Sequence, residues 1–216
     1  TSEFARERAT DELPQSAAGR TIMTTEPKFI PEEAVKISLD DSATLNVRMI
    51  DCVGYIVPSS LGYIENEQPR MVVTPWFDKE IPFNLAAEIG TQKVINEHST
   101  IGLVVTTDGS ISDIPREEYE EAEQRVVNEL RQINKPFVVL LNCTNPLAPA
   151  AVSLRASLEE RYGVPVVAVN CLELGEADIR VILSGGLFQF PVREVAVSLP
   201  GWVTSLAPHH WLRASL

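Results

Sequence analysis

A short acidic turn after an apolar segment is the part of this sequence best suited to chemistry. Leu45, Val47 and Met49 alternate with polar residues, as in a β-strand with one buried face, and the segment runs into Asp51-Cys52-Val53-Gly54. In a phosphate-binding α/β domain, a carboxylate at a strand end holds the water shell of Mg²⁺. A glycine after it offers its backbone N–H to the terminal phosphate. The spacing therefore predicts the metal side of a nucleotide site.

A cluster of threonines precedes this strand. Thr21, Thr24 and Thr25 lie in one short polar stretch, and an upstream threonine hydroxyl can complete the shell around Mg²⁺. Thr24 and Thr25 are therefore candidate catalytic residues beside Asp51, and Thr25 is also a candidate metal ligand. Neither signal is specific alone, because about one Asp-x-x-Gly match is expected by chance in a chain of this length. A plain strand and glycine turn stays open as the alternative.

A third signal concerns the base of the nucleotide. A later apolar run ends in Asn142-Cys143-Thr144-Asn145, where GTPases carry Asn-Lys-x-Asp and the Asp accepts two hydrogen bonds from guanine. Asn145 offers one acceptor and one donor, which disfavours guanine and permits a pair with adenine. Gly54, Asn142 and Asn145 are the candidate nucleotide-binding residues. Tyr55 stands where Ras-type GTPases place a water-orienting Gln, so hydrolysis should be slow or depend on another group.

The elements that would position these residues alternate between strands and helices. Alternating residues on both sides of Asp40-Asp41-Ser42 predict a β-hairpin. The other expected elements are strands at 101–106, 136–142 and 164–169 and helices at 84–98, 115–133, 149–162 and 176–187. The strands are continuous apolar runs, as in a sheet buried on both faces. The predicted fold class is α/β, with a mostly parallel sheet, helices on both faces and one antiparallel hairpin.

Composition shifts divide the chain into three parts. Residues 1–33 are predicted to form a polar N-terminal stub and a switch-like loop with the threonines, and 34–190 a nucleotide-binding domain. Residues 191–216 are predicted to be an exit segment toward a further domain, in which 195–199 alternate as in an edge strand. The proline-rich residues 55–83 predict a long surface loop.

The net charge and the cysteines limit the possible partners and the cellular compartment. A net charge of −12 argues against nucleic acid, and no segment approaches the ~20 apolar residues of a membrane span. The three widely spaced cysteines suit free thiols in a reducing cytosol. The acidic run Glu117–Glu123 predicts a solvated helix face. Gly185-Gly186 predicts a weakened last helix, by about 1 kcal/mol per glycine.

Longer residue strings carry a family resemblance. They are residues 11–29, 51–55, 69–71, 74–76, 86–91, 98–102 and 210–213. The first includes Thr21-Ile22-Met23-Thr24-Thr25-Glu26-Pro27-Lys28 and the last is His210-Trp211-Leu212-Arg213. Together they resemble the stage IV sporulation protein A family of endospore-forming bacteria, across essentially all 216 residues.

The resemblance implies a spore-coat morphogenetic ATPase with a P-loop NTPase-like fold, a relative of translation-factor-type GTPases. It implies ATP and Mg²⁺ as ligands, Asp51 as a Walker-B-like aspartate, and Thr24 and Thr25 as residues that sense the γ-phosphate. The Gly-x-x-x-x-Gly-Lys-Ser/Thr motif of that fold is absent from these residues. We therefore expect this chain to lack the first strand, P-loop and first helix, and to be inactive alone.

The resemblance also implies a biological setting. ATP hydrolysis would drive self-association into a polymer, the basement layer of the spore coat, at the outer surface of the forespore in the mother-cell cytoplasm. A small amphipathic membrane peptide and other coat proteins would bind through further domains. Two alternatives stay open from the residues: a non-catalytic scaffold module for subunit contact, and a GTPase of the same fold.

Overall fold

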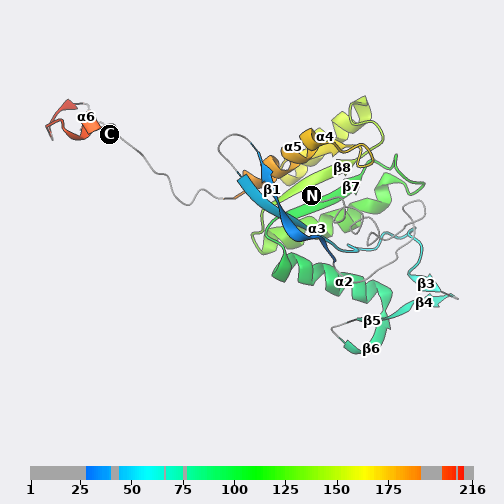
Figure 1. The fold of residues 1–216 in the computed structure, drawn as a ribbon. Helices are drawn as coiled ribbons and strands as arrows, with labels where there is room; N and C mark the ends of the chain where they lie inside the picture. The colour runs from blue at the N-terminus through cyan, green and yellow to red at the C-terminus, as the bar shows by residue number, and fades with distance from the viewer. Residues whose placement is uncertain are drawn as a thin grey trace.

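Parallel strands form the centre of the molecule (Figure 1). The computed structural model describes residues 28–39, 44–65, 67–74, 77–190, 201–207 and 209–211. Strands β7 (Gly102–Thr107), β8 (Phe137–Asn142) and β9 (Val166–Val169) pair in parallel in the order β7-β8-β9. They coincide with the predicted strands to within two residues at each end, which confirms the predicted parallel sheet.

One face of this sheet is covered by two helices. The 3-10 turn η2 (Arg116–Tyr119) leads into α3 (Glu120–Gln132), and α4 (Pro149–Tyr162) follows β8. The buried core joins residues of both helices to the sheet, namely Val127, Leu130, Leu158 and Tyr162 with Val104, Val139, Leu141 and Val166. Apolar residues recur at helical spacing along both helices, which predicts that this face of each helix is buried. The buried face of α3 includes Glu123, which differs from the predicted solvated run.

Helix α5 (Glu176–Leu187) covers the other face. A Cβ built on Gly186 would lie 3.3 Å from Ile101 Cγ2 and 3.7 Å from Val138 Cγ2, and one on Gly185 would also lie 3.7 Å from Val138. The glycine pair therefore lets α5 approach the sheet closely. The prediction of a weakened helix rested on propensity alone and missed this packing role. Helices on both faces are confirmed.

A separate antiparallel hairpin carries the predicted acidic turn. Strands β1 (Lys28–Ser38) and β2 (Thr44–Asp51) pair with Val35 opposite Val47 and Ile37 opposite Leu45. The predicted hairpin is confirmed, and its connecting residues 40–43 lie outside the described residues. Strand β1 begins at Lys28, within the part of the chain predicted as a loop. Proline and charged residues in Lys28–Glu33 hide the strand from a pattern search.

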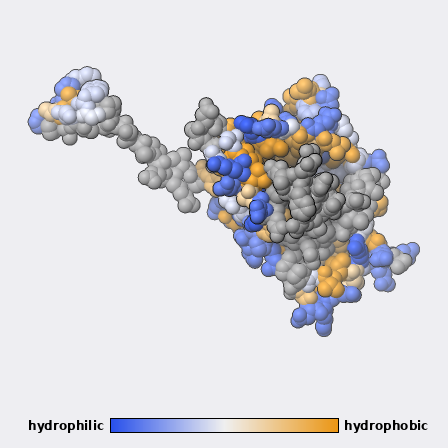
Figure 2. All heavy atoms as spheres, viewed as in Figure 1, coloured by the Kyte–Doolittle hydropathy of each residue, from blue (hydrophilic) through white to orange (hydrophobic). Residues whose placement is uncertain are grey.

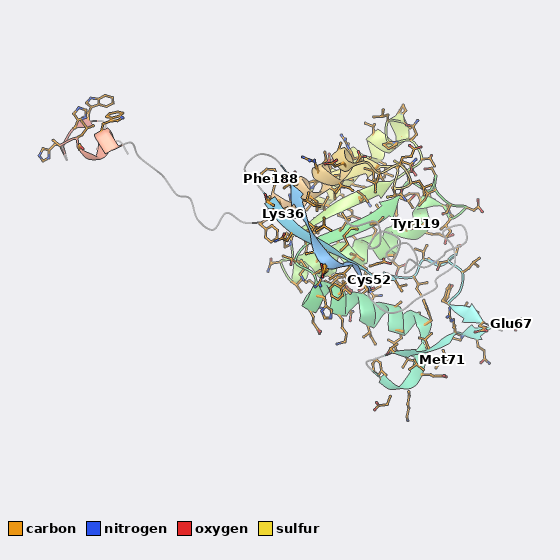
Figure 3. All side chains as sticks on the ribbon, in the orientation of Figure 1. Lys36, Cys52, Glu67, Met71, Tyr119 and Phe188 are labelled. Carbon is orange, nitrogen blue, oxygen red and sulfur yellow. The ribbon has the colours of Figure 1, made fainter. Side chains whose placement is uncertain are left out.

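Residues 55–83 are not one long loop. They contain two further antiparallel pairs, β3 (Ile64–Glu65) with β4 (Gln68–Pro69) and β5 (Met71–Thr74) with β6 (Phe77–Pro82). Prolines at the ends of β4 and β6 suggested a loop, but proline is tolerated at such positions in edge strands. Figure 3 shows Met71 on this part of the chain. Figure 2 shows apolar surface at β5, where Met71 and Val73 are exposed.

Helix α2 completes the part of the fold that adjoins the site. It spans Phe83–Lys93, continues as a single π-helical segment η1 (Val94–His98), and buries Phe83, Ala86 and Ala87. A short helix α6 (Gly201–Thr204) follows later in the chain. The predicted edge strand at 195–199 lies outside the described residues. None of the described helices combines the length and the apolar character that a membrane crossing requires.

Candidate functional site

The loops after the parallel strands are tied together into one polar edge. After β7, the Asp108 carboxylate accepts hydrogen bonds from Ser110 N (2.9 Å) and Ser110 Oγ (2.5 Å). The backbone N–H of Thr144, in the loop after β8, donates to Ser110 Oγ at 2.9 Å. The carboxyl edge of a parallel sheet is where open α/β folds bind ligands. This edge is therefore the first candidate site.

The two predicted base-binding asparagines have different surroundings. Asn142 ends β8, and its Oδ1 accepts a hydrogen bond from the backbone N–H of Cys171 at 3.0 Å, which fixes the loop after β9. Asn145 is exposed, and its Oδ1 accepts one from Leu147 N at 3.2 Å. Asn142 thus has a positioning role within the edge. Asn145 keeps its amide NH₂ group for a ligand, while its oxygen already has one partner.

The acidic turn after β2 is the second candidate site. Asp51 is the last residue of β2 and is exposed, and Gly54 has φ +78°. A Cβ built on Gly54 would meet no heavy atom within 4 Å. The left-handed conformation therefore favours glycine for its backbone, while open space remains beside it for a ligand. A carboxylate oxygen at this place suits a hard cation such as Mg²⁺.

Cys52 links this turn to helix α2. Burial raises the pKa of its thiol, against the opposing effects of the Gly54 backbone and the Thr91 side chain. Figure 3 shows Cys52 where the hairpin meets α2. The group is therefore a protonated, partly buried thiol that contributes packing rather than nucleophilic chemistry.

Tyr55 contacts two residues of helix α3. Its hydroxyl donates a hydrogen bond to Glu129 Oε2 on α3, and the guanidinium carbon of Arg125 lies 4.0 Å from the centre of its ring. Arg125 also pairs with Glu88 on α2 at 3.0 Å and with Glu129 at 3.3 Å. Burial and the Glu129 carboxylate raise the pKa of Tyr55 above its ordinary value. The hydroxyl is thus a neutral donor.

A second contact holds the same segment. The backbone N–H and the hydroxyl of Ser59 both donate to the Glu118 carboxylate, at 2.8 and 2.7 Å. The prediction that Glu117–Glu123 is only a solvated face is therefore wrong for Glu118. The error has a physical reason, because a sequence shows the charge of a residue but not the distant donor that folds against it.

The same prediction is wrong for Glu123, which is 5% exposed. Its carboxylate forms an ion pair with Arg116 at 2.7 Å and accepts a hydrogen bond from the Tyr162 hydroxyl at 2.7 Å. Burial would raise the pKa of Glu123, but hydrogen bonds from Arg116, Thr106 and Tyr162 and the charge of Arg116 lower it below its usual range. Tyr162 lies 39 positions from Glu123, so no local motif signals their contact.

The predicted site residues fall into two groups. Asp51 and Gly54 share the turn after β2, and Asn142 and Asn145 share the loop after β8. Thr24 and Thr25 lie outside the described residues. Asp108 and Ser110 were missed, although Asp108-Gly109-Ser110 follows an apolar strand just as Asn142 does. The end of an apolar strand is therefore a local signal that also points to Asp108 and Ser110.

Cysteine and metal chemistry add little to either site. Cys52, Cys143 and Cys171 are free thiols. Within the described ranges, no group of three or more His, Cys, Asp or Glu side chains is placed to hold a metal ion. The candidate cation site at Asp51 therefore has one described carboxylate, and its other ligands would be water, substrate oxygens or residues outside the described ranges.

The fold is an α/β domain with two polar candidate sites, one at the carboxyl edge of the parallel sheet and one at the end of the β1–β2 hairpin. The family model described as "Stage IV sporulation protein A, ATPase domain" matches residues 1–191, so the chain belongs to this family. The family resemblance read from the sequence is thus confirmed.

Curated relatives agree with the family match. The chain is 56% identical over 214 residues to Stage IV sporulation protein A of Bacillus anthracis and 51% identical over 215 residues to that of Bacillus subtilis (strain 168). It is 48% identical over 215 residues to that of Clostridioides difficile (strain 630). Each match covers 99% or 100% of this chain and 44% of the relative's length. No solved structure matches the chain.

Proposed function

We propose that this chain is part of an ATP-hydrolysing protein that acts in sporulation. The observation that carries the proposal is the Asp51–Gly54 turn, with its exposed carboxylate and its open, left-handed glycine, in a chain of an ATPase-domain family. The reaction is in-line attack of water on the γ-phosphate of ATP, in which the bond to the β,γ-bridging oxygen breaks and ADP leaves. The Gly54 N–H would donate to the terminal phosphate as negative charge develops there.

The Asp51 carboxylate at the turn suits a Mg²⁺ ion. Asp51 would hold it, partly through water, together with the Thr25 hydroxyl, while Thr24 and Thr25 act at the γ-phosphate. Bound Mg²⁺ neutralises phosphate charge and favours displacement of the terminal phosphoryl group. The exposed position of Asp51 at a strand end supports this assignment. Asn145 would contact the adenine base, and Asn142 would hold the adjoining loop in place.

We propose a P-loop NTPase-like topology for the whole domain. The antiparallel hairpin β1–β2 and the parallel series β7–β8–β9 support it. The phosphate-cradling Gly-x-x-x-x-Gly-Lys-Ser/Thr motif is not among these residues. Backbone N–H groups of such a loop carry much of the affinity for the phosphates, so tight ATP binding would require that segment. Tests of the function therefore belong in a full-length protein.

The biological role follows from the family and is also a proposal. ATP hydrolysis would drive self-association into the basement layer of the spore coat, in the mother-cell cytoplasm at the forespore surface. Contacts with an amphipathic membrane peptide and with other coat proteins would lie in the domains that the relatives carry beyond the matched 44% of their length.

Asp51→Asn in the full-length protein tests the proposal. The amide keeps the shape of the side chain and removes its charge, so ATP turnover should fall by about 10²-fold and polymerisation, followed by sedimentation, should fall with it. Asp78→Asn on the exposed strand β6 is the matched control and should retain turnover. Unchanged polymerisation without ATP turnover would establish the scaffold alternative.

The base specificity has its own test. Asn145→Asp restores the carboxylate that GTPases use to accept two hydrogen bonds from guanine. In competition against labelled ATP, GTP should displace little label from the wild type and more from the variant. If GTP at equal concentration already competes fully in the wild type, the assignment of ATP is wrong.

A further inference from the structure

We propose that Tyr55 is a positioning residue that fastens the Asp51–Gly54 turn to helices α2 and α3. We name the set Tyr55, Glu129, Arg125 and Glu88 the Tyr55 latch. The inference rests on the proposed ATP hydrolysis, because the turn is where that reaction would be supported.

The latch holds Tyr55 in two ways. Its hydroxyl donates to the Glu129 carboxylate, and its ring lies under the Arg125 guanidinium at 4.0 Å. The same guanidinium pairs with Glu129 and, at 3.0 Å, with Glu88. Arg125 thus connects α3 to α2, and Tyr55 is attached to both helices through it. A cation over an aromatic face and a charge-assisted hydrogen bond reinforce each other in one place.

The contact of Ser59 extends this attachment along the chain. Ser59 donates twice to Glu118 in η2, directly before α3. The segment from Tyr55 to Ser59 is therefore held at both ends by carboxylates of one helical unit. On the other side, Asp51 belongs to strand β2. The turn lies between two anchored points, and the direction of the Gly54 N–H depends on both.

This arrangement assigns a role to Tyr55 that differs from that of a water-orienting glutamine. Its hydroxyl proton is committed to Glu129, so it is not available to orient the attacking water in the same way. Tyr55 acts through its neighbour Gly54, by fixing a backbone donor. A misplacement of about 1 Å in such a donor can cost about 10²-fold in rate.

The chain contains a matched control for the latch. Tyr162 also donates its hydroxyl to a glutamate of α3, Glu123, but it comes from α4 and has no sequence link to the turn. Tyr55→Phe and Tyr162→Phe each remove one hydroxyl from one α3 carboxylate. A general loss of stability would appear in both variants, and Tyr162→Phe should suffer it more because its bond is buried.

The experiment uses the full-length protein with two measurements. Steady-state turnover gives kcat and KM for ATP, and hydrogen exchange without nucleotide follows the amides of residues 52–60. Tyr55→Phe should lower kcat roughly tenfold, leave KM within about twofold and speed exchange in 52–60. Tyr162→Phe should leave both close to wild type. Glu129→Gln, which keeps an acceptor oxygen, should lose less kcat than Glu129→Leu.

The possible outcomes distinguish a positioning role of Tyr55 from a general effect on stability. Equal loss of kcat in Tyr55→Phe and Tyr162→Phe, or unchanged exchange in 52–60, would overturn the latch. If the wild type shows no ATP turnover, the proposed function fails, and the exchange data alone decide whether Tyr55 holds the turn. If Tyr55→Phe does not fold, the order of Glu129→Gln and Glu129→Leu gives the same decision.

Discussion

Two tyrosine–glutamate–arginine clusters, each built around a glutamate of helix α3, differ in burial. In the buried cluster of Tyr162, Glu123 and Arg116, the side chains of the ion pair are 2% and 10% exposed. In the Tyr55 latch, those of Glu129 and Arg125 are 23% and 42% exposed. In both clusters an arginine and a tyrosine hydroxyl contact one glutamate. Only the latch also places its arginine over the tyrosine ring, and burial is the other main difference.

The difference shows how one helix can serve both the core and a site. Charges in the buried cluster interact with little screening, and losing one partner leaves the other uncompensated. The latch is open to water and salt, so each of its contacts is weaker. The buried cluster joins α3 to α4 and, through Thr106, to β7. The latch joins α3 to the segment that follows the turn after β2.

The largest effect should come from breaking the buried cluster. Glu123→Leu leaves the Arg116 guanidinium buried without its carboxylate, which should lower the free energy of unfolding by about 3–5 kcal/mol. Urea unfolding followed by circular dichroism measures it. The double variant Glu123→Leu with Arg116→Met removes both charges and should recover much of the loss. A single variant as stable as wild type would show that the ion pair is not buried in solution.

The second largest effect should be a loss of stability of the buried cluster at acidic pH. Because the folded pKa of Glu123 is lowered, its stabilisation is present above the ordinary value of 4.5 and is lost as the pH falls through the lowered value. Unfolding free energies measured at decreasing pH should therefore fall in the wild type and fall less steeply in Glu123→Gln. Equal slopes in the two proteins would contradict the assignment.

The smallest effect should come from the exposed arginine of the latch. Arg125→Gln removes pairs with Glu88 and Glu129 that are partly open to solvent, so stability should fall by less than about 1 kcal/mol. High salt should reduce the difference from the wild type, because exposed charges are screened. A loss as large as that of Glu123→Leu would remove the contrast between the two clusters. Thermal unfolding at low and high salt makes the comparison.

The regular elements were the predictable part of the fold. Helix α4 matches its predicted range at both ends, since a proline starts it and a glycine follows it. Continuous apolar runs in the sequence predicted β7, β8 and β9, because the strands of a sheet with helices on both faces are buried on both sides. The short strands of residues 55–83 were not found, because two to six residues with prolines carry too little periodicity.

The sequence predicted those parts of the candidate site that depend on local features and not on contacts between distant residues. Asp51 and Gly54 could be chosen because a strand end and a glycine turn are local features. The partner of Tyr55 could not be chosen, because Glu129 is 74 positions away and looks like any solvated charge on a helix. The roles of Glu118 and Glu123 were misread for the same reason.

The sequence by itself determined the family, the alternation of strands and helices, and the acidic turn, because these depend on residue type and local spacing. Only the tertiary structure decided which charges are buried, which loops are joined, and that Tyr55 faces α3 rather than the open space beside Gly54. Those outcomes depend on which distant side chains meet when the helices pack, and the free energy of a charge changes with its surroundings far more than with its neighbours in sequence.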